Sequence, residues 1–292
     1  MQFPFFRYSL FLLVFFFSAC RQMPQRAPEV VLPDVVPVVH EVQIPSAAMN
    51  KSYGAFVLLP TAYQKDTARH FPVVYLLHGY SGAYGDWYKK MPSLLEYADQ
   101  HEIIIVTPDG NYSSWYLDSP LDQDWQFETY VGVEIPKWVD ANYRTVAKRE
   151  GRAITGLSMG GHGGLYLAFN HQDIFGAAGS MSGGVDIRPF SGKWDLAKRI
   201  GSQAEYMENW EEYSVVNRLD LLKPETTPAL IIDCGVDDFF YQVNLDLHQK
   251  LLERKIAHDF ISRPGEHTWP YWENAVVYQL LFFDRYFKEG GY

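Results

Sequence analysis

A serine between two glycines is the first feature of this sequence that could do chemistry. The run Gly156-Leu157-Ser158-Met159-Gly160 follows a short apolar stretch and precedes a segment of helical character, His162–Asn170. In a sharp turn from strand to helix, glycines at these two positions let neighbouring main chain approach closely. The N-terminus of the following helix also favours developing negative charge. Ser158 is therefore the candidate nucleophile for acyl transfer.

An acid and a histidine follow Ser158 in the order that such a turn requires. Asp237 and Asp238 come directly after the apolar run Leu230–Cys234, and His267 follows the strand-like stretch Phe260–Ser262. Because parallel strands end at the same edge of a sheet, we expect His267 to meet Ser158 and one of the two aspartates there. Of the other eight histidines, His78 and His162 lie nearest to these motifs, and we expect them to shape the site rather than act as its base.

The run His78-Gly79-Tyr80-Ser81-Gly82 closes the apolar stretch 72–77. Main-chain N–H groups at this position commonly bind the oxygen that becomes negative during acyl transfer, together with the N–H that follows the nucleophile. The sequence therefore predicts Tyr80 and Met159 as the backbone donors of an oxyanion hole. Each such donor contributes about 3 kcal/mol to the stability of the transition state.

Alternating strands and helices are expected to position these groups. Short apolar runs predict strands at 38–44, 53–59, 72–77, 103–106, 153–157, 177–181, 230–234 and 260–262. Amphipathic stretches predict helices at 93–100, 126–142, 161–170 and 241–253, with a final helix after His267. This alternation predicts an α/β fold with a mostly parallel central sheet flanked by helices. The segment around 182–220 breaks the rhythm, and we expect it to form a lid over the carboxyl edge of the sheet.

The first twenty residues have the pattern of a signal peptide. Arg7 precedes a wholly apolar stretch, Leu10–Phe17, which is shorter than the about 20 residues that a membrane-spanning helix needs. The small pair Ser18-Ala19 before Cys20 is similar to a bacterial lipobox, so Cys20 is the expected lipidation site. Ordinary cleavage nearby, with Cys20 incidental, is the alternative.

The sequence divides into three parts on this interpretation. Residues 1–20 form the signal peptide, residues 21–37 with four prolines form an extended tether, and residues 38–292 form one catalytic domain. We therefore expect an exported bacterial lipoprotein, anchored to a membrane in the periplasm or at the cell surface by its lipid.

Composition limits the partners further. The net charge of −10, without a run of Lys or Arg, argues against nucleic acid as a partner. Histidines and acids show no metal-ligand spacing, and no nucleotide-binding loop is present, so we expect neither a metal nor another cofactor. Once Cys20 is set aside, Cys234 is alone in the chain and is expected to be a small buried apolar residue.

Four further motifs carry a resemblance to a known family. They are Leu76-Leu77-His78-Gly79, Pro108-Asp109-Gly110-Asn111, Ser114-Trp115-Tyr116-Leu117-Asp118-Ser119-Pro120 and the whole run Ile154–Ala168. Over about 46–286 the chain resembles the esterase D-like branch of the α/β hydrolases, which includes feruloyl and acetyl esterases, tributyrin esterases and S-formylglutathione hydrolases.

The resemblance implies an α/β-hydrolase fold and a catalytic triad of Ser158, Asp238 and His267, with Asp238 preferred to its neighbour Asp237. It implies a serine carboxylesterase that acts on short-chain, acetyl or feruloyl esters of carbohydrates through an acyl-enzyme on Ser158. Aromatic residues near these motifs could stack on a sugar or an aromatic acyl group, with Trp115 and Trp269 as the expected substrate contacts.

Three alternatives remain open. S-formylglutathione hydrolases typically have Gly-Leu-Thr-Cys where this chain has Gly79-Tyr80-Ser81-Gly82, which argues against their thioester substrate. Some proteins of this fold transfer the acyl group to a sugar hydroxyl instead of water. A glycan-binding lipoprotein without catalysis is the third, and it would use the tryptophans as a sugar platform: Trp115, Trp125, Trp194 and Trp210.

Overall fold

The computed structural model describes residues 1, 2, 4 and 36–292. Most of the predicted signal peptide, the lipidation site Cys20 and most of the predicted tether lie outside the described residues. Among the residues that are described, no helix is both long and apolar enough to cross a membrane.

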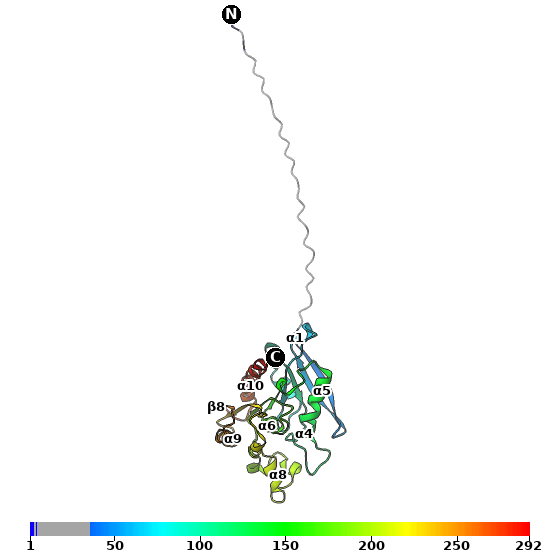
Figure 1. Ribbon diagram of the computed structural model, residues 1–292, viewed down its shortest axis with the longest axis vertical. Coiled ribbons are helices and arrows are strands. Elements are labelled where there is room, and N and C mark those ends of the chain that lie inside the picture. The colour runs from blue at the N-terminus through cyan, green and yellow to red at the C-terminus, as the bar shows by residue number, and fades with distance from the viewer. Residues whose placement is uncertain (3, 5–35) are drawn as a thin grey trace. The chain divides into compact units, whose positions relative to one another are not determined.

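A central sheet of eight strands carries the domain (Figure 1). The strands are β1 (Val38–Ser46), β2 (Lys51–Leu59), β3 (Val73–Leu77), β4 (Ile104–Pro108), β5 (Arg152–Gly156), β6 (Ala177–Met181), β7 (Ala229–Gly235) and β8 (Asp259–Arg263). Their spatial order is β1-β2-β4-β3-β5-β6-β7-β8. The six strands from β3 to β8 run parallel, and β1 and β2 form an antiparallel hairpin whose second strand pairs with β4. The predicted mostly parallel α/β sheet is confirmed.

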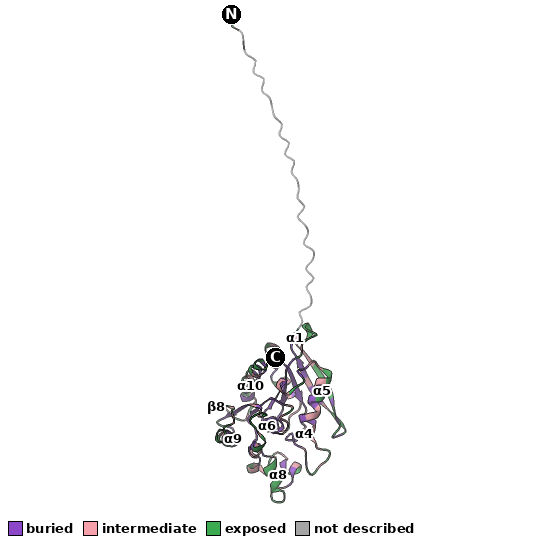
Figure 2. Ribbon diagram, in the orientation of Figure 1, coloured by how far each residue is buried: buried purple, intermediate pink, exposed green. Residues whose placement is uncertain are grey.

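Helices cover both faces of this sheet, so the inner strands are buried throughout (Figure 2). Alternate residues of each strand belong to opposite cores: in β3, Tyr75 packs on one side and Leu76 on the other. One face is covered by α4 (Phe127–Thr129), the π-helical turn η1 (Tyr130–Glu134), α5 (Ile135–Asn142), α6 (Met159–Asn170) and α9 (Tyr241–Glu253). The other face is covered by α2 (Asp86–Lys90), α3 (Leu94–Gln100) and α10 (Trp269–Glu289). The short α1 (Thr61–Lys65) and the 3-10 turn η2 (Arg149–Gly151) lie in connections.

The helix predicted at 126–142 contains a wider π-helical turn. Pro136 lies in the first turn of α5 and has no N–H group to bond to the carbonyl of Gly132. A local π-helical turn is one way for a helix to accommodate such a missing bond. The turn also brings Glu134 to the β1–β2 hairpin, where its Oε1 accepts hydrogen bonds from the N–H groups of Ala47 and Ala48, each 3.0 Å long.

The lid-like segment expected at 182–220 is an insertion between β6 and β7. It contains only short helical pieces: η3 (Arg188–Phe190), α7 (Leu196–Ile200), α8 (Met207–Glu212), η4 (Val215–Asn217) and η5 (Leu219–Leu221). Hydrogen bonds to both its main-chain carbonyls and its side chains join it to the rest of the domain. Trp115 Nε1 donates to Trp194 O at 3.1 Å, and Tyr213 OH donates to Asp118 O at 2.9 Å.

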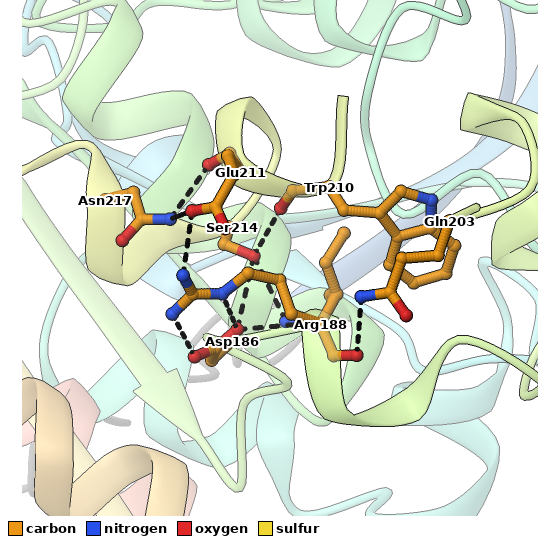
Figure 3. Close-up of polar contacts among 8 residues, drawn as sticks. Asp186, Arg188, Gln203, Trp210, Glu211, Ser214 and Asn217 are labelled. Atoms are coloured by element: carbon orange, nitrogen blue, oxygen red, sulfur yellow. Dashed lines mark hydrogen bonds and ion pairs between the residues drawn. The ribbon is translucent and has the colours of Figure 1, made fainter. Parts of the chain in front are cut away.

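A polar network inside the lid holds these short helices together (Figure 3). The guanidinium of Arg188 donates to both carboxylate oxygens of Asp186, at 2.8 and 2.6 Å, and to Glu211 Oε2 at 2.7 Å. Ser214 Oγ donates to Asp186 at 3.3 Å, and Gln203 donates to the Arg188 carbonyl at 3.0 Å. Desolvation would raise the pKa of Asp186, but the hydrogen bonds and charge of Arg188 outweigh it and lower that pKa.

We expect Asp186→Asn to destabilise the folded domain at pH 7 by about 1–3 kcal/mol, because the amide has no charge opposite Arg188 and offers one acceptor oxygen in place of two. The folded-state pKa of Asp186 lies below that of the unfolded chain, so its contribution is present above about pH 4 and disappears as pH falls through the folded value. Thermal unfolding at pH 7 and at decreasing pH measures both effects.

Glu211→Gln is the matched control, since Glu211 contacts the same arginine with a side chain that is 49% exposed. Exposed ion pairs contribute about 0–1 kcal/mol, so this variant should unfold close to the wild-type temperature. Equal destabilisation by the two variants at every pH would contradict the role given to Asp186.

Candidate active site

The turn between β5 and α6 presents Ser158 in a backbone conformation that few residues adopt, with φ 56° and ψ −115°. Neighbouring main chain leaves no room for side chains around it. A Cβ on Gly156 would lie 2.6 Å from the carbonyl oxygen of Leu77, and one on Gly160 would lie 2.6 Å from the carbonyl oxygens of both Leu77 and His78. The glycines on either side of Ser158 therefore allow this turn to pack against the end of β3.

Three side chains form one hydrogen-bonded line at the carboxyl edge of the sheet. His267 Nε2 lies 2.9 Å from Ser158 Oγ, and His267 Nδ1 lies 2.8 and 3.0 Å from the two carboxylate oxygens of Asp238. The Asp238 side chain is fully buried, so its carboxylate is well placed to hold the proton on Nδ1. Nε2 is then free to accept the proton of Ser158, which is the geometry for general-base activation of a nucleophile.

The structure distinguishes the two neighbouring aspartates. Asp237 is exposed, and its main-chain N–H donates to Gly265 O at 3.0 Å, whereas Asp238 points inward to His267. Asp238 Oδ1 also accepts the N–H of Phe240 at 2.8 Å, which fixes the carboxylate further. In the loop after β8, Gly265 has φ 151°, and a Cβ there would lie 2.2 Å from the ring of Tyr271.

The turn after β3 lies directly beside Ser158. A Cβ on Gly79 would be 2.6 Å from the Leu157 side chain and 3.4 Å from Ser158 Cβ. His78 Nε2 accepts the N–H of Gly110 at 2.8 Å, so its Nδ1–H is left to donate to Gly79 O at 2.8 Å. Within residues 36–292, the N–H groups of Tyr80 and Met159 have no hydrogen-bond partner and are free to bind a substrate oxygen.

Comparisons with known proteins identify the family of this chain. Residues 46–283 match the family model described as "Putative esterase". The chain belongs to this esterase family. It is accordingly a serine hydrolase of the carboxylesterase type.

Individual relatives differ in their names and in how much of the chain they match. The esterase is 27% identical over 265 residues to an "Acetyl esterase" of Caldicellulosiruptor saccharolyticus, covering 82% of this chain and 95% of the relative. It is 36% identical over 157 residues to "Diacylglycerol acyltransferase/mycolyltransferase Ag85B" of Mycobacterium leprae, covering 51% of this chain and 45% of that relative. A solved structure described as a "ferulic acid esterase" matches with a TM-score of 0.75 and 27% identity, over 87% of this chain and all of the other.

A pocket of about 580 Å³ opens at Ser158 in this esterase. Besides Ser158 and His267 it is lined by Gly79, Tyr80, Gly82, Asp86, Leu157, Trp194, Phe239, Thr268, Trp269 and Trp272. Among the described residues, no group of three or more His, Cys, Asp or Glu side chains is arranged to hold a metal ion.

The structure separates the two tryptophans that the sequence placed at the substrate. Trp269 lines the pocket, whereas Trp115 is only 1% exposed and lies outside the pocket lining. The expectation of a direct substrate contact by Trp115 is corrected, because its ring packs at 5.4 Å from His162 and its Nε1 supports the lid at Trp194. Of the tryptophans considered as a sugar platform, Trp210 is also fully buried and only Trp194 reaches the pocket.

His78 and His162 are both engaged away from the serine hydroxyl. The ring nitrogens of His162 face the carbonyl oxygens of Trp115 and Tyr213 at 3.0 and 2.8 Å, joining α6 to the lid. Desolvation of this buried ring lowers the pKa of His162 to about 4, so it is neutral at physiological pH.

Two aromatic residues of the pocket, Phe239 and Trp272, were not predicted as site residues from the sequence. The Phe239 ring lies 4.2 Å from the His267 ring between centroids, and Trp272 lies 4.8 Å from it. The sequence held a signal for both, because Phe239 directly follows Asp238 and Trp272 lies one turn after Trp269 on α10.

We expect Asp238→Asn to lower kcat by about 10⁴-fold, since an amide no longer favours the tautomer that leaves Nε2 of His267 free to accept a proton. Asp237→Asn is the matched control and should keep kcat close to the wild-type value, because Asp237 is exposed and remote from the imidazole. Steady-state hydrolysis of nitrophenyl acetate measures both. A larger loss in the Asp237 variant would reverse the assignment of the acid.

Proposed function

We propose that this esterase hydrolyses acetyl, other short-chain or feruloyl esters of carbohydrates through an acyl-enzyme on Ser158. The observation that carries the proposal is the line of hydrogen bonds from Ser158 through His267 to the buried Asp238. The names of the acetyl esterase and ferulic acid esterase relatives support the substrate class.

The proposed reaction begins when His267 Nε2 takes the proton of Ser158 and the serine oxygen attacks the ester carbonyl. The N–H groups of Tyr80 and Met159 then bind the negative oxygen of the tetrahedral intermediate, and the dipole of α6 adds to this stabilisation. His267 returns the proton to the departing alcohol, which leaves an acyl group on Ser158. A water molecule activated by the same histidine hydrolyses that ester, and Asp238 holds the imidazole throughout.

The walls of the pocket favour a short or flat acyl group. The rings of Trp87, Trp269 and Trp272 pack edge to face behind the base, at 5.2 and 5.6 Å between successive centroids. Trp87 is fully buried, and its Nε1 donates to Leu77 O at 2.9 Å, so this wall is fixed. A long flexible chain would have to displace packed indoles, whereas an acetyl, butyryl or feruloyl group would not.

A sugar hydroxyl could replace water as the acceptor of the acyl group. The acyltransferase named among the relatives supports this second candidate, over about half of each chain. A thioesterase of the formylglutathione type has less support, because the turn Gly79-Tyr80-Ser81-Gly82 lacks the cysteine typical of those enzymes. A purely glycan-binding role has less support as well, since Trp115 and Trp210 are buried.

We expect the purified domain to hydrolyse nitrophenyl acetate and butyrate with higher kcat/KM than nitrophenyl palmitate, and to release acetate or ferulate from xylan fragments. Ser158→Ala should abolish this turnover and covalent labelling by a fluorophosphonate, because only the nucleophilic hydroxyl is removed. Circular dichroism of the variant controls for folding.

Labelling that persists in Ser158→Ala would overturn the assignment of the nucleophile. A preference for palmitate, with xylan fragments left intact, would contradict the carbohydrate substrate class. Faster release of the acyl group when a sugar alcohol is added, with formation of a new sugar ester, would favour the acyltransferase.

Export and attachment to a membrane through lipidated Cys20 are also part of the proposal. They rest on the sequence pattern of residues 1–20, since Cys20 lies outside the described residues. We expect Cys20→Ala to move the full-length protein from the membrane fraction to the soluble periplasm or medium, because the substitution removes the thiol that would carry the lipid anchor. Immunoblots of cell fractions measure this, and unchanged fractionation would favour simple signal cleavage.

A further inference from the structure

Exposed aromatic side chains line one side of the pocket mouth. Tyr112 is 53% and Phe239 52% exposed, and both lie next to pocket-lining residues, Tyr80 and Trp194. We call these four residues, Tyr112, Tyr80, Trp194 and Phe239, the aromatic strip. Exposed large rings usually occur singly, so a contiguous group beside a nucleophile points to a binding surface.

Contacts between neighbours make the strip continuous. Tyr112 and Tyr80 pack edge to face with ring centroids 4.9 Å apart, and Trp194 and Phe239 stack at 5.6 Å with an interplanar angle of 22°. The two pairs are linked because Tyr80 OH donates to Asp195 Oδ2 at 3.2 Å, next to Trp194 in the chain. The strip therefore runs from the oxyanion turn, across the lid, to the ring that covers His267.

Two residues at the centre of the strip have an unfavourable backbone conformation. Trp194 and Asp195 are consecutive non-glycine residues in the left-handed region, with φ 52° and 58°. Such residues persist only where surrounding contacts impose them, and they cluster at functional sites. Here Trp115 Nε1 holds the carbonyl of Trp194, and Lys198 Nζ pairs with Asp195 Oδ1 at 2.7 Å.

The chemistry of the strip suits sugar rings better than lipid chains. Its rings offer flat apolar faces, while the hydroxyls of Tyr80 and Tyr112 and the carboxylate of Asp195 offer hydrogen bonds at their edges. A hydrocarbon chain would have to desolvate those polar groups without replacing their bonds. Tyr80 also stays neutral, because desolvation and its contacts with Tyr112 and Asp195 raise its pKa to about 12.

We propose that the aromatic strip binds sugar residues of the glycan chain on either side of the esterified residue, so that the enzyme prefers oligomeric to monomeric alcohols. This inference rests on the proposed carbohydrate-ester function and adds where the glycan binds on the enzyme surface. The acyl group then occupies the recessed part of the pocket between Gly82, Trp269 and Trp272, the last of which is only 6% exposed.

The test compares kcat/KM for acetylated or feruloylated xylo-oligosaccharides with kcat/KM for nitrophenyl acetate. Tyr112→Ala should lower the ratio of the oligosaccharide value to the nitrophenyl acetate value about 3- to 10-fold, equivalent to about 0.7–1.4 kcal/mol for one lost aromatic stacking contact. Tyr112→Phe keeps the ring and should retain most of the ratio. Leu281→Ala, at a 50% exposed position on α10, is the surface control and should leave the ratio at the wild-type value.

Binding gives a readout that does not need turnover. Titration of unesterified xylo-oligosaccharides into the Ser158→Ala protein, followed by calorimetry, should show tighter binding with chain length, and adding Tyr112→Ala should weaken that dependence. If the wild type hydrolyses nitrophenyl acetate but neither the ratio nor binding responds to Tyr112→Ala, the strip is not a glycan site and the esterase function stands. If no ester is hydrolysed, the proposed function fails, and the binding series alone decides for or against the strip.

Discussion

The site depends on one close contact, between the main chain that carries Ser158 and the carbonyl oxygens at the end of β3. Gly156 and Gly160 permit it, and any side chain at either position would push the two strands' ends apart. The turn at Gly79 lies beside the same main chain, since a Cβ on Gly79 would be 3.4 Å from Ser158 Cβ. The proposed oxyanion hole, with the N–H groups of Tyr80 and Met159 as donors, depends on this close packing.

The side chains of His267 and Asp238 are positioned by a second close approach, between the loops that follow β7 and β8. A Cβ on Gly235 would lie 2.2 Å from Gly265 O, so the loops touch without intervening side chains. Behind them the buried carboxylate of Asp233 is bonded to Arg263 and to the hydroxyl of Tyr271. This anchor lies outside the chemistry, yet it joins β7, β8 and α10, the elements that bracket Asp238 and His267.

Much of this arrangement could be predicted from the sequence, because it follows from local rules. Continuous apolar runs mark strands buried on both faces, and the order of Ser158, Asp238 and His267 after successive strands places them at one edge. The burial of Trp115 could not be predicted, because an indole occurs both on exposed stacking surfaces and in buried packing sites. The π-helical turn at Tyr130–Glu134 was missed because apolar periodicity does not report a lost N–H at Pro136. The stack of Trp194 on Phe239 depends on tertiary packing of the lid.

The position of the lid in the chain has an evolutionary consequence. It enters after β6 and leaves before β7, and its charged cluster is satisfied largely within itself (Figure 3). A lineage could therefore replace or remodel this one segment, and with it one wall of the pocket, while the strands that hold Ser158 and His267 stay unchanged. In a family built in this way, substrate preference can change while the reaction stays the same. Recombination at the two lid borders would be a natural route to such diversity.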